Sequence, residues 1–198
     1  MKTYMMYMLA FILLSAQACK ESVVPSEVKE VIPPLYPDYA EVTIPASIAP
    51  LNFTVKEKFS RINALIEGSI SGSIEVQDKE AIQFSEKEWK KLLTENTDGS
   101  LKVTVSIKNE KGWIQYAPFS IYVSPYPIDY GLVYRLIAPG YEVYSKMGIY
   151  QRSLSDFVQT TLIENTLLPG NCVNCHSFNQ NNPSFMNLHI RGEHGATM

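Results

Sequence analysis

Apolar and polar residues alternate with a period of two over much of the chain between residues 40 and 125, which is the pattern of half-buried strands. The alternation is clearest at residues 101–107, where every second residue is aliphatic. A polar turn at residues 109–112 leads from there into residues 113–116, and this arrangement predicts a hairpin. Similar segments cover residues 41–44, 51–55, 60–76 and 119–123. About six to eight short strands in roughly 85 residues predict a mainly β fold, an immunoglobulin-like or fibronectin-like sandwich over residues 40–125.

One helix interrupts the predicted strands. Ser85 and Glu88 stand at the two ends of a capping box, and Phe84 and Trp89 occupy the hydrophobic-staple positions around it. An apolar pair at residues 92–93 supplies a buried side, and the turn-forming segment 96–99 stops the helix. We therefore expect one short helix over residues 86–93, covering the open end of the sandwich.

The N-terminus has the pattern of an export signal. Lys2 precedes an unbroken apolar run at residues 5–14, and small residues lead up to Cys19. Ten apolar residues rise only about 15 Å as a helix, roughly half the hydrocarbon core of a bilayer, so the run is too short to span. Residues 14–19 (LSAQAC) resemble a bacterial lipobox. We therefore predict a signal peptide over residues 1–18 and a lipid anchor on Cys19; cleavage elsewhere, with Cys19 as a free thiol, is the alternative.

Residues 19–39 contain prolines at positions 25, 33, 34 and 37. Proline fixes φ and removes a backbone donor, so this density favours an extended tether over packed structure. Such a tether would lift the folded domain off the membrane.

Residues 126–165 are predicted to form an irregular, aromatic connecting segment, in which several tyrosines are interleaved with Arg135 and Arg152. These residues could stack on bases or sugars, or they could fasten the segment onto the sheet. The net charge is -3 and no Lys/Arg run occurs, so the sequence gives no indication of a nucleic-acid partner.

The sequence contains one motif with specific chemistry, Cys-x-x-Cys-His at Cys172, Cys175 and His176. If the two thiols lie one helical turn apart, both can form thioethers with the vinyl groups of one haem, and His176 can be the proximal iron ligand. A second axial ligand would come from downstream, where Met186, His189 and His194 are the candidates. Haem c is therefore the predicted covalent cofactor.

Other interpretations of the two cysteines stay open. Exported cysteine pairs often form structural disulfides, in which case no cofactor is bound. The pair could be redox-active, although the chain lacks a βαβ pattern. Zinc could be held by Cys172, Cys175, His176 and a downstream histidine, but adjacent ligands are cramped.

Residues 141–152, 171–180 and 191–195 resemble Bacteroidetes lipoproteins in which a Cys-x-x-Cys-His segment, often labelled cytochrome c, precedes a TolB-like or WD40-like β-propeller. The resemblance is to the N-terminal part of such proteins. It implies lipid anchoring at the outer membrane and haem at Cys172, Cys175 and His176. The propeller would begin about where this sequence stops, so we expect residues 166–198 to be an irregular haem-attachment segment. Either the β domain supplies the wall of its haem pocket, or the segment is truncated and a following propeller supplies it.

These features predict an exported lipoprotein of the cell envelope that carries haem for electron transfer or haem handling, with a redox protein as its partner. The alternative is an envelope binding or scaffold lipoprotein, with a glycan or protein ligand and a Cys172–Cys175 disulfide. Since neither Gly-x-Ser-x-Gly nor His-Glu-x-x-His occurs, we do not expect enzyme activity. Which face of the outer membrane carries the protein is left open by the sequence.

Overall fold

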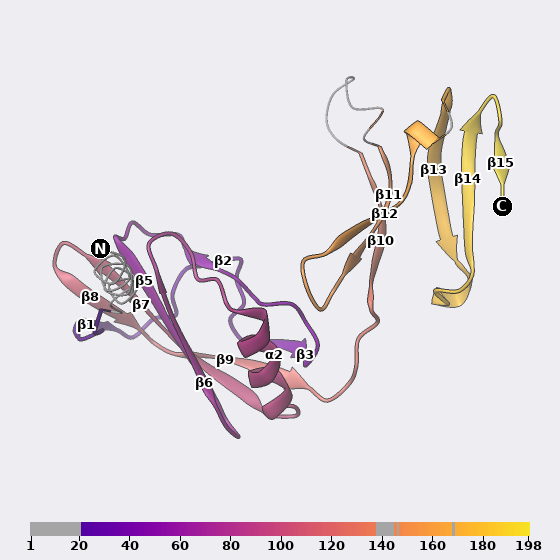
Figure 1. Ribbon diagram of the computed structural model, residues 1–198. Coiled ribbons are helices and arrows are strands. Elements are labelled where there is room, and N and C mark those ends of the chain that lie inside the picture. Colours follow the sequence, from indigo (N-terminus) through magenta and orange to yellow (C-terminus); the bar gives the residue numbers. More distant parts are fainter. Residues whose placement is uncertain (1–20, 138–144, 146, 168) are drawn as a thin grey trace, which may run out of the picture.

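The computed structural model describes residues 21–137, 145, 147–167 and 169–198. The predicted signal peptide and Cys19 lie outside the described residues. The chain forms a larger β domain near its N-terminus, followed by two small sheets near its C-terminus (Figure 1). Figure 1 places the two small sheets at the end of the molecule away from β1 and β8.

The larger domain contains nine strands and one α-helix among the described residues. Its elements are β1 (Pro25–Lys29), β2 (Leu35–Tyr36), β3 (Val42–Pro45), β4 (Thr54–Val55), β5 (Arg61–Gly68), β6 (Ser73–Asp78), α2 (Glu86–Glu95), β7 (Ser100–Asn109), β8 (Gly112–Tyr116) and β9 (Phe119–Ser124). Six further strands follow: β10 (Gly131–Leu136), β11 (Gly148–Ser153), β12 (Gln159–Glu164), β13 (Asn171–Phe178), β14 (Met186–Gly192) and β15 (Ala196–Thr197). The prediction of a mainly β fold with one helix is confirmed, and the arrangement is consistent with a β-sandwich.

Strand β7 is the centre of a seven-stranded sheet. It pairs antiparallel with β5 along one edge, and with β9 and then β8 along the other. Strand β6 extends the sheet beyond β5, whereas β1 and β3 add in parallel to β8 and β9. The predicted hairpin of β7 and β8 is confirmed, with Asn109 opposite Gly112 at its turn.

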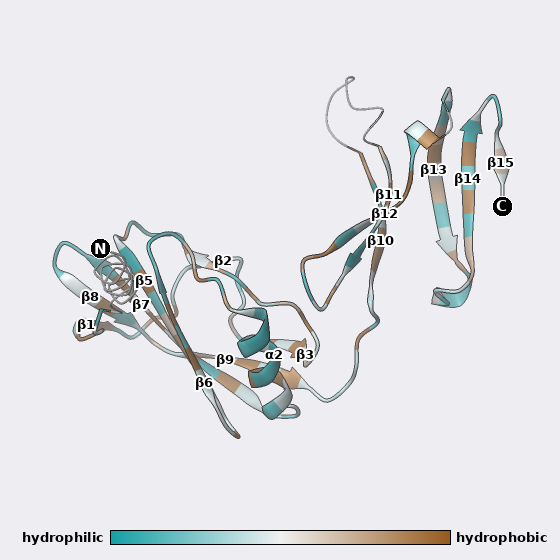
Figure 2. Cartoon of the chain, in the orientation of Figure 1, coloured by the Kyte–Doolittle hydropathy of each residue, from teal (hydrophilic) through white to brown (hydrophobic). Residues whose placement is uncertain are grey.

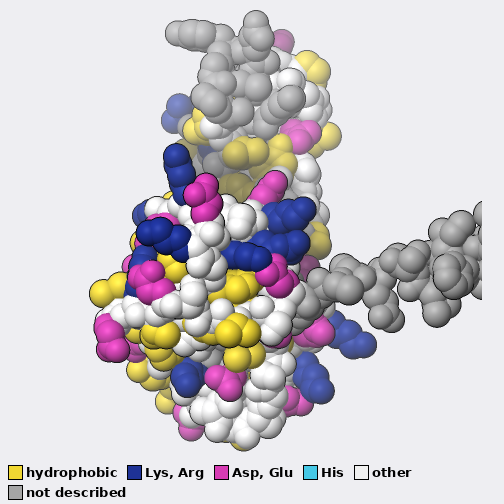
Figure 3. All heavy atoms as spheres, turned by 90° about the vertical axis from the view of Figure 1, so that its left-hand side faces the viewer, with side chains coloured by type: hydrophobic (Ala, Val, Ile, Leu, Met, Phe, Trp, Pro, Cys, Tyr) yellow, Lys and Arg dark blue, Asp and Glu magenta, His cyan; other side chains and the backbone are white. Residues whose placement is uncertain are grey.

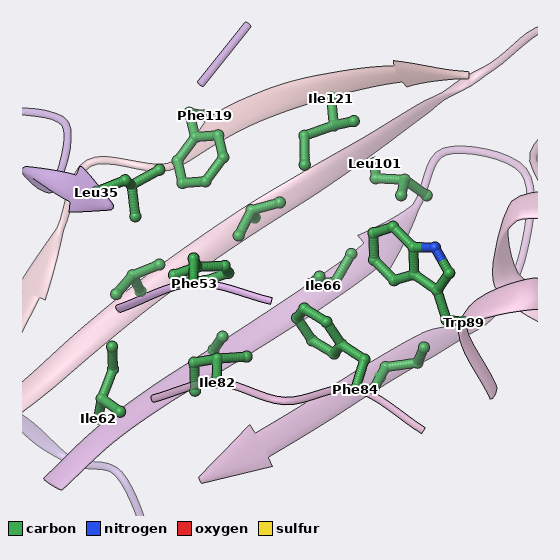
Figure 4. Packing of buried hydrophobic residues seen from close by; sticks show 14 of the residues in the cluster. Leu35, Phe53, Ile62, Ile66, Ile82, Phe84, Trp89, Leu101, Phe119 and Ile121 are labelled. Carbon is green, nitrogen blue, oxygen red and sulfur yellow. The ribbon is translucent and has the colours of Figure 1, made fainter. Parts of the chain in front are cut away.

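The core lies on one face of this sheet. The alternating aliphatic residues of β5 and β7 are buried there, as the period-two pattern predicted. Helix α2, the β2–β4 pair and the bridge between Phe53 and Ile82 cover this face (Figure 4). Figure 2 shows that α2 is mostly hydrophilic; its buried residues are Trp89, Leu92 and Leu93.

Helix α2 begins where the sequence predicted, at Glu86, and extends to Glu95, two residues beyond the predicted end. The staple forms, because the rings of Phe84 and Trp89 stack with centroids 5.1 Å apart. The capping box does not form in full, since the Ser85 side chain makes no capping hydrogen bond. The side chain of Asn96 ends the helix. Its Nδ2 donates to the carbonyl of Leu92 at 2.8 Å, and its Oδ1 accepts from the backbone N–H of Ile70 at 2.8 Å.

The expectation of a free tether over residues 19–39 is wrong for its described part. Strand β1 pairs in parallel with β8, and β2 pairs with β4, so both prolong the domain. Leu35 is only 3% exposed and belongs to the core. The prolines do hold the chain extended, but Pro25 stands at the first residue of an edge strand, where a missing donor is tolerated.

The two C-terminal segments are also more regular than the sequence predicted. Strands β10, β11 and β12 form a three-stranded antiparallel sheet in that order, and strands β13, β14 and β15 form a second one. A small cluster joins them, with Val133, Ile149 and Ile163 on the first sheet. Val173, Leu188 and Ile190 form its other side. Each of the strands β10 to β14 contributes only one or two residues to this cluster, so the periodicity was too brief to be recognised in the sequence.

Candidate functional site: the cysteine-bearing sheet

Cys172, Cys175 and His176 lie on a strand, β13, and not on a helix. The expected placement of the two thiols one helical turn apart is therefore wrong. Strand β13 pairs antiparallel with β14, and its register shifts between Val173 and Cys175, so that Asn174 is an extra residue in the ladder.

This bulge decides which face of the sheet each side chain occupies. Cys172 lies opposite Arg191, and Cys175 lies opposite His189. Residues directly opposite one another share a face, and Arg191 and His189 are two apart on β14, so both cysteines lie on one face of the sheet. In a regular strand, two residues three positions apart would point to opposite faces.

His176 lies on the other face. It is opposite Leu188, which is buried together with Ile190 against the β10–β12 sheet. Figure 2 shows the resulting alternation of hydrophobic and hydrophilic bands along β14. The imidazole Nε2 is 3.4 Å from the carbonyl oxygen of Val133, and the ring meets Phe178 edge-on at 6.4 Å between centroids. The register therefore assigns His176 and the two thiols to opposite faces of the β13–β14 ladder.

Both cysteines are free; Cys172 is half-buried and Cys175 is exposed. The guanidinium of Arg135, on β10, donates from Nη2 to Cys172 Sγ at 3.6 Å. The sequence singled out Arg135 only as one of two arginines, interleaved with tyrosines, that could stack on bases or sugars. Arg135 lies 37 positions before Cys172 in the sequence, so no local spacing could have indicated this contact.

The candidates for a second axial ligand are separated by the same register. His189 lies on the face of the thiols, and its Nδ1 is 2.8 Å from Thr197 Oγ1. Met186 lies opposite Phe178, on the face of His176. His194 is exposed in the turn between β14 and β15, where its backbone N–H donates to Asn171 Oδ1 at 2.9 Å. Of the three, His189 alone shares the face of the two cysteines.

A hollow of about 310 Å³ lies at the turn that joins β13 to β14. Apolar side chains of Phe178, Phe185 and Met186 line it together with polar residues. Among the described residues, no three His, Cys, Asp or Glu side chains are gathered closely enough to hold a metal ion.

The neighbouring sheet holds a tyrosine pair that the sequence placed in an irregular segment. Tyr134 and Tyr150 lie opposite one another on β10 and β11, with their rings stacked at 6.3 Å. The hydroxyl of Tyr134 donates to Gln159 on β12, and that of Tyr150 donates to the Glu164 carboxylate at 2.6 Å. These contacts hold the tyrosines to their own small sheet. The sequence-based alternative was different, because it had the aromatic residues fasten the segment onto the sheet of the β domain.

The Tyr150–Glu164 contact leads to a pH prediction. The hydrogen bond to Glu164, with burial second, raises the pKa of Tyr150 to about 12. The unfolded chain has a tyrosine pKa of about 10 and loses this proton first, so the contact stabilises the fold below about pH 10 and less as the pH rises toward 12. We expect Glu164→Gln to lower the pKa of Tyr150 toward 10. The measurement is a pH titration of tyrosinate absorbance, from which the titration of a Tyr150→Phe variant is subtracted to isolate the signal of Tyr150. An unchanged titration would show that the carboxylate is not the cause.

The comparisons with known proteins add no family. No protein-family model matches the sequence, and no curated protein is significantly similar to it. Within the residues that the structure describes, none of the helices has the length and apolar character needed to cross a bilayer.

Proposed function

We propose that this chain is an exported lipoprotein of the outer membrane, anchored through Cys19, whose β13 thiol pair attaches haem covalently for electron transfer or haem handling. The observation that carries the proposal is the bulge at Asn174, which brings Cys172 and Cys175 onto one face of the sheet. Two thioether bonds to a single porphyrin need both sulfurs on the same side of the backbone.

The fit to haem is good for the thiols and poor for His176. Cys172 is half-buried and Cys175 is exposed. The register assigns His176 to the opposite face, and its Nε2 lies 3.4 Å from the Val133 carbonyl oxygen, a contact that this nitrogen would give up on binding iron. His189 is directly across from Cys175 and is the imidazole that this strand arrangement offers on the face of the thiols. Bound haem would supply a one-electron redox couple, and no substrate cleft is required.

Haem staining tests this proposal. The mature lipoprotein, produced in a bacterium that matures c-type cytochromes, is denatured and examined for covalent haem by staining and by Soret absorbance. The matched control is the double variant Cys172→Ser, Cys175→Ser. We expect covalent haem in the native chain and none in the variant; a colourless native protein overturns the haem assignment.

A second candidate is an envelope scaffold lipoprotein whose Cys172–Cys175 pair forms a disulfide. It is favoured by the position of His176 on the opposite face, where it could not ligate a haem held by the thiols. Titration of thiols in the denatured protein separates the two candidates. A disulfide yields two titratable thiols only after reduction, whereas two thioethers yield none under either condition.

A further inference from the structure

The chain enters the folded domain at a fixed point, Glu21. Its carboxylate pairs with Lys108 and lies 3.5 Å from Arg61. Its backbone exchanges two hydrogen bonds with the side chain of Gln77, at 3.2 and 3.1 Å. Strands β5, β6 and β7 all contribute to this attachment, so Glu21 is held at one end of the β domain.

Only one residue separates Glu21 from Cys19 in the sequence. A fully extended chain covers at most about 3.6 Å per residue, so the Cα atoms of Cys19 and Glu21 are no more than about 7 Å apart. This step rests on the lipid anchor proposed above. If Cys19 is acylated, the bilayer surface lies next to Glu21, and no spacer is left to lift the domain away from it.

The surface beside this attachment has the composition of a membrane contact. Val24, directly before the edge strand β1, is 71% exposed, and Val28, within β1, is 62% exposed. Ser26, between them, donates to the carbonyl of Lys111 at 3.3 Å, so β1 runs alongside the β7–β8 turn. Lys58 and Lys111 border a hollow of about 370 Å³ at this turn.

Figure 3 views the molecule from this end and shows hydrophobic and basic side chains next to one another across the face, with acidic side chains among them. Aliphatic side chains can enter the boundary between headgroups and acyl chains, and lysines can extend their ammonium groups to the phosphates. Glu27 and Glu110 lie in the same region, so the charge is mixed. The lipid anchor, and not net charge, therefore supplies the main affinity.

We propose that this N-terminal edge, made of Val24, Val28, Lys58 and Lys111, lies directly on the lipid bilayer that holds the Cys19 anchor. The domain is then oriented as well as tethered. Because β13–β15 lie at the end of the molecule away from β1 and β8, the cysteine-bearing sheet projects away from the membrane, toward soluble partners (Figure 1).

Tryptophan quenching in vesicles tests the proposed contact. The native Trp89 and Trp113 are buried and give a constant background. The probe is Val24→Trp, and the matched control is Ile70→Trp, because Ile70 is also an exposed aliphatic residue, 64% exposed, in the turn at the opposite end of β5. Both variants are made as full-length mature lipoproteins and inserted into vesicles of phosphatidylethanolamine and phosphatidylglycerol.

We expect acrylamide to quench the tryptophan at position 24 about threefold less than the one at position 70, with a blue-shifted emission only at position 24. Equal quenching at the two positions overturns the proposed contact. Mass spectrometry of the N-terminal peptide separates this failure from that of the anchor. A diacylglyceryl group on Cys19 with equal quenching removes only the membrane contact, whereas an unmodified Cys19 removes the anchor and the contact together.

Discussion

Replacing Trp89 by alanine is expected to lower the free energy of unfolding by about 3–5 kcal/mol, the largest stability effect that we predict for one residue. Trp89 has no exposed surface, stacks on Phe84, and donates from Nε1 to the carbonyl of Ile48 at 3.1 Å. The substitution would leave a cavity between α2 and the sheet and a carbonyl without its donor.

Urea denaturation followed by circular dichroism measures this effect. Lys91→Ala is the control, because Lys91 lies on the exposed side of the same helix and makes only a 3.8 Å pair with Glu95. That change should cost less than about 0.5 kcal/mol. If Trp89→Ala costs no more than Lys91→Ala, helix α2 does not hold the core together as described.

The second large effect concerns His176 and His189, the two histidines of the cysteine-bearing sheet, and it rests on the proposed haem attachment. In protein with covalently attached haem, His189→Ala is expected to abolish the absorbance signature of imidazole ligation, while His176→Ala leaves it unchanged. The reason is the register, which places His189 on the face of Cys172 and Cys175 and places His176 on the face of Leu188.

Haem staining should be unaffected in both histidine variants, because the thioether bonds do not involve imidazole. This control separates loss of a ligand from loss of the haem itself. If His176→Ala abolishes the signature and His189→Ala does not, then β13 is not a bulged strand in the haem-loaded protein, and the ligand suggested by the motif is the correct one.

Local sequence patterns were sufficient wherever neighbouring residues determine the structure. The alternation at residues 101–107 gave β7, because side chains in a strand point alternately into the core and away from it. Phe84 and Trp89 indicated the start of α2, because the staple joins the residue before the N-cap to the fourth residue of the helix. The spacing of Cys172, Cys175 and His176 identified the candidate site without any structural information.

The tertiary structure decided what depends on distant partners. The sequence of residues 25–36 does not indicate that β1 pairs with β8 or that β2 pairs with β4, because backbone hydrogen bonds between strands are not specific to residue type. The same holds for Arg135, which reaches Cys172 only because two sheets share a small core. In the candidate site, one extra residue at Asn174 determines the faces of both thiols and of His176. A shift of one residue in a strand exchanges its two faces, and the pairing with β14 fixes that shift.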